Sequence, residues 1–284
     1  AIARGAYEAG VKVACAYPGT PSTEILENIA HYDRIKSQWA PNEKVALEVC
    51  IGASIAGARS LAAMKHVGVN VAADPLLTFS YTGVNGGMVL VSADDPEMHS
   101  SQNEQDNRYY GLLAKIPVLE PSDSQEAKDF TKLGLVLSET FDTPVILRTT
   151  TRVNHSKSLV AIEEPQEIEL KPYVKDPAKY VMTPAYAKGR HAVVEERRRA
   201  LTEYAAATPL NRVEPGDRKV GIITSGISYQ YLKEIMPEAS FLKLGLLWPL
   251  NEKLIKDFAD SVDQVYVVEE LEPVLELQIK AMGI

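Results

Sequence analysis

The alternation of short apolar runs with helical patterns is the feature that most constrains the fold of this 284-residue chain. Thr20 can cap a helix that starts at Pro21, and an amphipathic helix is predicted over 123–138. Strands that alternate with helices form a mostly parallel sheet with helices on both faces. We therefore predict a doubly wound α/β fold for the first part. Its predicted strands are residues 11–17, 60–64, 87–93, 117–119 and 144–148.

A second, smaller α/β unit is predicted after a break in this pattern. From about residue 151 to 184 the sequence is charged and contains several prolines, which is typical of an extended linker. The alternation then resumes. We place the first unit at 1–152, the linker at 153–190 and the second unit at 191–284. Strands of the second unit are predicted at 219–225, 241–244 and 264–269.

The composition and several missing motifs exclude whole classes of protein. The net charge of −8 is spread along the chain, without the basic stripe that binding to nucleic acid or an anionic membrane requires. No run of about 18 apolar residues could span a membrane. The GxGxxG, P-loop, HExxH and GxSxG signatures are absent, which argues against dinucleotide, nucleotide, zinc and hydrolase sites. We expect a cytoplasmic protein with no nucleic-acid or membrane partner.

Cys15 and Cys50 are the whole cysteine content of the chain. Two thiols cannot build a four-cysteine zinc or iron–sulfur site. We predict that both pack as small apolar residues in a reduced compartment, and that the chain holds no metal through its own residues.

A predicted helix opens at Asn42 and Glu43, and as far as residue 59 its body consists mostly of apolar and small residues. Gly52 and Gly57 lie in this segment, and a glycine costs roughly 1 kcal/mol in a helix interior relative to alanine. We expect close backbone packing to compensate. Glu43 either interacts with the helix dipole, as acidic residues in a first turn commonly do, or is carried to a site where it does chemistry.

Two further polar segments follow predicted strands, where ligands gather in doubly wound sheets. In residues 17–22 a turn containing Thr20 leads into a helix whose backbone N–H groups favour an anion, although an ordinary capped turn explains the same residues. Residues 99–108 are all polar, and Arg108 could either grip a carboxylate or pair with a neighbouring acidic side chain. His66 could line the same cleft or simply be solvated.

Four motifs occur in a fixed order along residues 1–150, and each is weak alone but specific in combination. They resemble the thiamine-diphosphate-dependent 2-oxoacid:ferredoxin oxidoreductases, and within that family the indolepyruvate-type alpha subunits. TrpProLeuAsnGlu (248–252) and ValGluGluLeuGluPro (268–273) are similar to the transketolase-C-like domain of that family. The four motifs are TyrProGlyThrProSerThrGlu (17–24), AsnGluLysValAlaLeuGlu (42–48), MetLysHisValGlyValAsnValAlaAlaAspPro (64–75), and AlaAspAspPro (93–96) with SerSerGlnAsnGluGlnAspAsnArg (100–108).

The resemblance gives Glu43 a catalytic and cofactor-binding role. In this family a Glu that opens the equivalent helix hydrogen-bonds the N1′ atom of the cofactor's aminopyrimidine. Sharing a proton there favours the tautomer whose 4′ nitrogen can accept the proton of the thiazolium C2. The first unit is accordingly expected to be a pyrimidine-binding domain.

The resemblance assigns further residues to the same site. Thr20 and Arg108 are expected to bind the 2-oxoacid, Arg108 through the carboxylate. Val67 and Gly68 are expected to contact the cofactor ring, and His66 to lie on the substrate side. No metal ligand is assigned to this chain.

The resemblance also implies components that this sequence lacks. Thiamine diphosphate and its Mg²⁺ need a pyrophosphate-binding domain with a GlyAspGly…Asn motif, and [4Fe-4S] clusters need cysteines; neither occurs here. We expect a truncated chain, or a subunit of a split enzyme, that supplies half of a cofactor site. Expected partners are the pyrophosphate-binding domain or subunit, a beta- or gamma-type subunit and ferredoxin, with CoA as co-substrate and two such halves paired as a dimer.

The expected reaction is the oxidative decarboxylation of arylpyruvates to acyl-CoA, with ferredoxin as electron acceptor. Gly19 stands where pyruvate-specific relatives commonly carry Ile, which favours the arylpyruvate branch. The alternative is a non-catalytic assembly module, whose small-residue helix packs against a separate thiamine-binding subunit.

Overall fold

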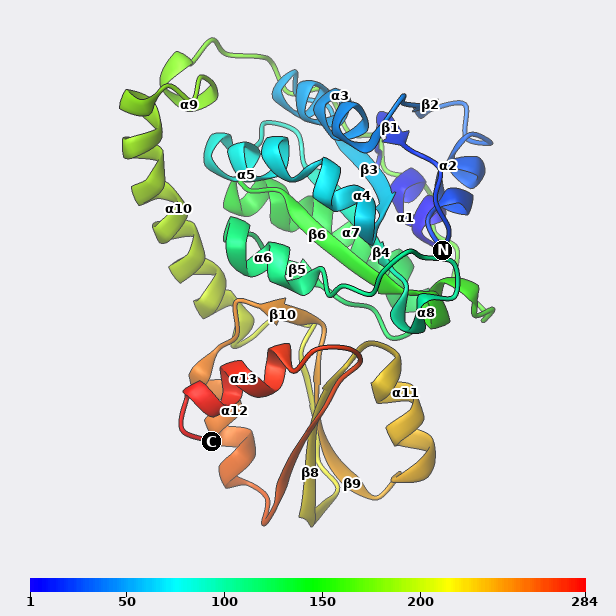
Figure 1. Cartoon of the computed structure of the whole chain (residues 1–284), viewed down its shortest axis with the longest axis vertical. Helices are drawn as coiled ribbons and strands as arrows, with labels where there is room; N and C mark the ends of the chain where they lie inside the picture. The colour runs from blue at the N-terminus through cyan, green and yellow to red at the C-terminus, as the bar shows by residue number, and fades with distance from the viewer.

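The computed structural model describes residues 1–284, and its first sheet has seven strands in the order β10-β5-β6-β4-β3-β1-β2 (Figure 1). Neighbouring strands are parallel except β10, which pairs antiparallel with β5. The predicted doubly wound, mostly parallel sheet is confirmed. Its strands are β1 (Val13–Ala16), β2 (Lys36–Trp39), β3 (Ser60–Lys65), β4 (Met88–Asp94), β5 (Val118–Leu119), β6 (Val145–Thr150) and β10 (Leu246–Trp248).

Helices cover both faces of this sheet. The central strands β3 and β4 are buried along their whole length, as their nearly continuous small and aliphatic sequences require. Each face has its own apolar core. The helices are α1 (Ile2–Glu8), α2 (Thr23–Ile29) and α7 (Ser124–Phe141) on one face, and α3 (Glu43–Ile55), α4 (His66–Val71), α5 (Ala73–Thr82) and α6 (Arg108–Ala114) on the other.

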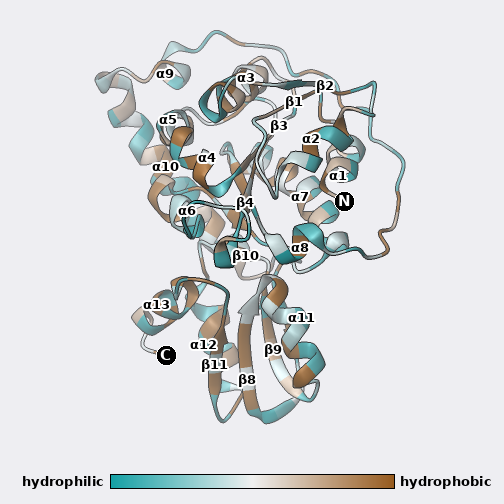
Figure 2. Cartoon of the chain, turned by 45° about the vertical axis from the view of Figure 1, so that its right-hand side comes forward, coloured by the Kyte–Doolittle hydropathy of each residue, from teal (hydrophilic) through white to brown (hydrophobic).

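The second sheet has four strands in the order β11-β8-β9-β7, of which only β7 is antiparallel. Its central strand β8 is exposed at its first residues and buried toward the first sheet, and Figure 2 shows the matching change from hydrophilic to hydrophobic. The predicted second α/β unit is confirmed. Its elements are β7 (Arg212–Glu214), β8 (Asp217–Ser225), α11 (Gly226–Ile235), β9 (Ala239–Leu244), α12 (Glu252–Asp260), β11 (Val265–Val268) and α13 (Val274–Ala281).

The segment between the two sheets is extended only over residues 156–176. This extended part passes along the edge of the first sheet at which the parallel strands begin. There the carbonyl of Lys171 occupies the place that a Cβ of Gly57 would take, and Gln166 N donates to the carbonyl of Glu8 at 2.8 Å. Two short helices and one long helix flank the extended part, so the predicted linker is not extended throughout. These helices are α8 (Thr151–His155), α9 (Pro177–Tyr180) and α10 (Pro184–Ala205).

Three local predictions were wrong. The helix that opens at Asn42 ends at Ile55 and does not reach residue 59, because Gly57 takes a left-handed φ of +96° and turns the chain into β3. Gly52 has no atom within 4 Å of the place a Cβ would occupy, so close packing within this chain does not compensate for it. LysHisValGly (65–68), for which the sequence favours a loop, instead contains the last residue of β3 and the start of helix α4.

A buried carboxylate, Glu8, ties α1 to α7 and to the extended segment. Its oxygens accept hydrogen bonds from Arg4 at 2.8 Å and from Lys128 and Lys132 at 3.0 Å. Burial by itself would raise the pKa of Glu8, but these donors and the amide of Glu163 lower it to about 2. None of the helices is both long and apolar enough to cross a membrane.

Candidate functional site at the carboxyl edge of the first sheet

The strand order brings all four sequence motifs to one edge of the first sheet. β4, β3, β1 and β2 are consecutive neighbours and parallel, so their carboxyl ends lie side by side. The turn at 17–22 follows β1, Glu43 follows β2, residues 66–68 follow β3, and the polar segment up to Arg108 follows β4. Motifs that are separate in the sequence therefore face one region of the molecule.

Glu43 does not cap its own helix. The side chain of Asn42 does this, because its Oδ1 accepts a hydrogen bond from Val45 N at 3.0 Å. The Glu43 carboxylate has no hydrogen-bond or ion-pair partner in the chain. It lies instead against Gly68, where an added Cβ would be 2.5 Å from Glu43 Cγ and 2.7 Å from its Oε1. The two predicted cofactor-binding residues are thus in contact, and the carboxylate is available to a ligand.

The turn that follows β1 leaves the Thr20 hydroxyl free. Local hydrogen bonds fix the backbone of this turn: Ser22 Oγ donates to the Gly19 carbonyl at 2.7 Å, and Gly19 N donates to Thr23 Oγ1 at 2.9 Å. Gly19 packs on the stem of Lys65, whose Cβ would lie 3.3 Å from an added Cβ. The exposed Thr20 side chain makes no hydrogen bond. The turn is therefore prefolded, and its threonine faces outward at the edge.

His66 is fully buried and connects the start of α4 to the loop after β4. Its Nε2 lies 3.2 Å from the carbonyl of Asn103, and its own carbonyl accepts from Asn107 Nδ2 at 3.0 Å and Gln105 Nε2 at 3.1 Å. Its Nδ1 has no partner. The alternative of a solvated histidine is therefore wrong. Val67, the next residue, is half-buried between His66 and Gly68.

The Arg108 guanidinium is buried and bonds to several groups of the protein. It is 1% exposed, it pairs with Asp106, and its Nη1 donates to Glu269 Oε2 at 2.5 Å. Its Nη2 also donates to the carbonyls of Glu270 at 2.7 Å and Glu272 at 2.9 Å. Arg108 thus joins the first sheet to the end of β11. These contacts give no support to its predicted role in binding a substrate carboxylate, which stays a prediction.

Asp95 organises the loop that follows β4, and the sequence reasoning did not single it out. Its carboxylate accepts from Ser100 N at 2.8 Å, Ser101 Oγ at 2.5 Å and Thr151 Oγ1 at 2.8 Å. Burial would raise the pKa of Asp95, but these donors lower it. The loop includes η1 (Pro96–Met98), in which two residues other than glycine have a left-handed φ. Strained backbone of this kind persists where surrounding contacts fix it, often at functional sites.

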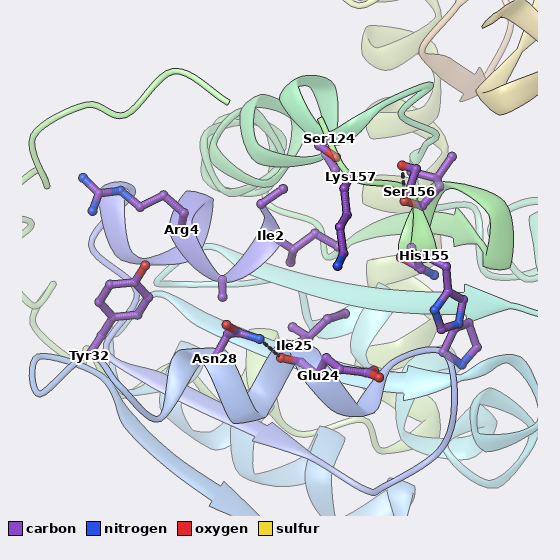
Figure 3. A pocket seen from close by; sticks show the side chains of 16 residues that line it. Ile2, Arg4, Glu24, Ile25, Asn28, Tyr32, Ser124, His155, Ser156 and Lys157 are labelled. Atoms are coloured by element: carbon purple, nitrogen blue, oxygen red, sulfur yellow. Dashed lines mark hydrogen bonds between the residues drawn. The ribbon is translucent and has the colours of Figure 1, made fainter. Parts of the chain in front are cut away.

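A pocket of about 420 Å³ lies between α1, α2, the start of α7 and the segment after β6. Figure 3 shows Glu24 and Asn28 of α2 on one side and Lys157 and His155 on the other. None of the predicted site residues lines it. The pocket is therefore separate from the group formed by Glu43 and Gly68.

Comparison with known proteins gives the family of this chain. Residues 4–214 match the family described as "Pyruvate flavodoxin/ferredoxin oxidoreductase, thiamine diP-bdg". The fold and this match define the class as a thiamine-diphosphate-binding α/β protein. More closely, the chain belongs to the pyruvate flavodoxin/ferredoxin oxidoreductase family.

The chain is also similar to curated relatives over its whole length. It is 48% identical over 297 residues to the indolepyruvate oxidoreductase subunit IorA of Archaeoglobus fulgidus and 45% identical over 295 residues to that of Pyrococcus horikoshii. These alignments cover 100% and 99% of this chain, but 48% and 46% of the relatives. The chain thus spans about half the length of the curated relatives it matches.

Two solved structures share the fold. A 2-oxoglutarate:ferredoxin oxidoreductase from Magnetococcus marinus, with 2-oxoglutarate, coenzyme A and succinyl-CoA bound, superimposes with a TM-score of 0.78 at 19% identity, covering 99% of this chain and 59% of that one. A split-gene transketolase, in an inactive beta4 tetramer, gives a TM-score of 0.60 at 13% identity, covering 99% and 83%. At these identities the likeness concerns the fold alone.

Proposed function

We propose that this chain is the aminopyrimidine-activating half of a thiamine-diphosphate-dependent 2-oxoacid:ferredoxin oxidoreductase that oxidatively decarboxylates arylpyruvates to acyl-CoA. One observation carries the proposal: the Glu43 carboxylate has no partner in the chain, while Asn42 takes over the capping role. The names of the indolepyruvate oxidoreductase relatives support an arylpyruvate substrate.

The residues at this edge fit the aminopyrimidine end of thiamine diphosphate. Because Gly68 has no Cβ, the Glu43 side chain can lie against its backbone, and the carboxylate there has no partner in the chain and can meet a ring nitrogen. When bound, the cofactor supplies a carbon nucleophile and an electron sink for decarboxylation. Glu43 holds a proton at the ring nitrogen N1′ and so sets the basicity of the amino group opposite. Val67 and Gly68 support the ring, and the free hydroxyl of Thr20, with His66 nearby, orients the 2-oxoacid.

The remaining components come from other domains or subunits. A pyrophosphate-binding domain or subunit would hold the diphosphate and Mg²⁺, [4Fe-4S] clusters would pass electrons to ferredoxin, and CoA would accept the acyl group. Coenzyme A bound to the 2-oxoglutarate:ferredoxin oxidoreductase supports the last point. We further propose a beta- or gamma-type partner, a dimer of halves and a cytoplasmic location. The division into 1–152, 153–190 and 191–284 also stays a proposal, and β10 belongs to the first sheet although it lies within 191–284.

Substitution of Glu43 tests this proposal in the complete oxidoreductase. Glu43→Gln keeps the size of the side chain but removes the shared proton, so turnover of an arylpyruvate should fall by at least about 100-fold. Glu48→Gln is the matched control, because Glu48 is an exposed carboxylate on the same helix. The assignment fails if Glu43→Gln turns over at a rate near that of the unchanged enzyme.

The outer face of α3 favours a second candidate, a non-catalytic assembly module. Gly52 and Ala56 are exposed there, and a surface of such small residues permits close approach of a partner. An assembly module would purify with a separate thiamine-binding subunit, and that complex would keep its activity in the Glu43→Gln variant. Loss of activity in the same variant would exclude this candidate.

A further inference from the structure

One buried cation in this chain has no counter-ion. Seven lysine and arginine residues are buried, and six of them lie within 4.0 Å of a carboxylate. Lys65 is 8% exposed and makes no ion pair at all. The six paired residues are Arg59, Arg108, Lys128, Arg148, Arg197 and Lys243.

Lys65 stands in the middle of the candidate site. It is the last residue of β3, three positions before Gly68, which touches Glu43. The Lys65 stem packs under Gly19 in the turn that carries Thr20. Its Nζ donates to the carbonyl of Ser100 in the loop after β4. The ammonium group therefore lies between the turn and this loop, at the edge where the substrate is expected.

No carboxylate of the chain lies within 4.0 Å of the Lys65 ammonium. The charge of Lys65 contributes to the lowered pKa of Asp95, yet the two groups are not within ion-pair distance. The Asp95 oxygens are already occupied by two serines and Thr151. An ammonium group has three donors, and the protein accepts only one from Lys65. A buried charge without a partner is costly, so it persists where a ligand supplies the opposite charge.

We propose that Lys65 binds the carboxylate of the 2-oxoacid substrate. The inference rests on the proposed function. It adds Lys65 to the role expected of Arg108, whose guanidinium already donates to Glu269 and to the carbonyls of Glu270 and Glu272. The carboxylate would lie between the Lys65 ammonium and the Thr20 hydroxyl, with the keto carbon directed toward the cofactor beside Glu43. Because a lysine ammonium acts as a point charge, it would bind the carboxylates of 2-oxoacids with different side chains in the same way.

The test compares Lys65→Met with the unchanged residue in the complete oxidoreductase. Two constants are measured, the KM for an arylpyruvate and the inhibition constant of its neutral methyl ester. We expect the KM to rise by about 10- to 100-fold, the usual value of a charge-assisted hydrogen bond, while the inhibition constant of the ester changes by less than about twofold. Lys65→Arg should restore most of the affinity for the acid, because it restores the charge.

Two further variants separate substrate binding from a structural role. Ser101→Ala loosens the same loop by removing a hydroxyl from Asp95, and it should leave the KM unchanged. Lys65→Gln keeps a donor for the Ser100 carbonyl but no charge, and it should behave like Lys65→Met. Because an unpaired charge is removed, Lys65→Met should unfold at a denaturant concentration no lower than the unchanged chain. A large loss of stability would indicate a structural lysine and overturn the inference.

The outcomes distinguish this inference from the proposed function. If arylpyruvate oxidation requires Glu43 but the KM of Lys65→Met stays within about threefold of the original, only the role of Lys65 is refuted. The role of Lys65 is likewise refuted if the inhibition constant of the methyl ester rises together with the KM. If the complete enzyme oxidises no 2-oxoacid, the proposed function is refuted and the role of Lys65 with it.

Discussion

Replacing Gly68 by alanine should separate activity from stability. The added Cβ would lie 2.5 Å from Glu43 Cγ, whereas carbon atoms in contact are about 3.5–4 Å apart, so the Glu43 side chain must move by about 1 Å. Misplacement of a catalytic group by 1 Å can cost about 100-fold in rate. We therefore expect the kcat of Gly68→Ala for an arylpyruvate to fall by about 100-fold.

The same substitution should leave the fold intact. Gly68 lies in α4 without a left-handed φ, and alanine is favoured over glycine in a helix by about 1 kcal/mol. The half-buried Glu43 carboxylate has no partner to lose, so it can swing aside. The free energy of unfolding should consequently stay within about 1 kcal/mol of the original value.

Gly52→Ala is the matched control for this experiment. It is also a helical glycine, but an added Cβ there meets nothing within 4 Å. We expect unchanged turnover and a gain in unfolding free energy of about 0.5–1 kcal/mol. Turnover is measured with an artificial electron acceptor in the complete enzyme, and stability by denaturant titration. Retained activity in Gly68→Ala, or its unfolding, would refute the reasoning.

Three other substitutions test the supporting structure. Glu8→Gln should lower the unfolding free energy by about 3 kcal/mol. Since the pKa of Glu8 in the folded chain is about 2, below the ordinary 4.5, its contribution to stability is complete above about pH 4.5 and is lost toward pH 2. Denaturant titrations across this pH range should therefore show that the unfolding free energy of the variant falls less steeply with acid than that of the unchanged chain. Arg108→Met should destabilise the chain by about 3–5 kcal/mol by leaving Glu269 unpaired; a selective rise in KM with unchanged stability would instead restore its predicted substrate role. Gly57→Ala should release the extended segment near Lys171 and speed its cleavage by protease, and an unchanged cleavage rate would contradict the described packing.

The placement of the site at one edge could be predicted, because it follows from local patterns. Parallel strands bring their carboxyl ends together, so motifs that follow β1, β3 and β4 had to converge, whereas β2, which precedes Glu43, is not among the predicted strands. The capping role of Asn42 is equally local, since an asparagine before an apolar helix is a common N-cap. The first fact brings the other motifs to the edge, and the second leaves the Glu43 carboxylate free.

The charge partners could not be predicted, because they depend on distant parts of the chain. Arg108 meets Glu269, which lies 161 residues further along. Lys65 is unusual only through the lack of a carboxylate within 4.0 Å, and no sequence pattern records which acidic groups come near in space. The start of α4 at His66 was missed for a similar reason, since its burial against the loop after β4 provides the stabilising contacts.

The antiparallel strand β10 gives the chain protection against aggregation. A sheet edge exposes unpaired N–H and C=O groups that recruit strands from other molecules. Without β10, β5 would be the edge strand of the first sheet. β10 pairs with β5, and next to this pair Glu120 N donates to the Gly245 carbonyl at 2.9 Å. A fragment that ends before Leu246 should therefore self-associate more strongly in sedimentation than the whole chain. The second part of the chain thus shields the sheet that carries the chemistry from pairing with its own copies.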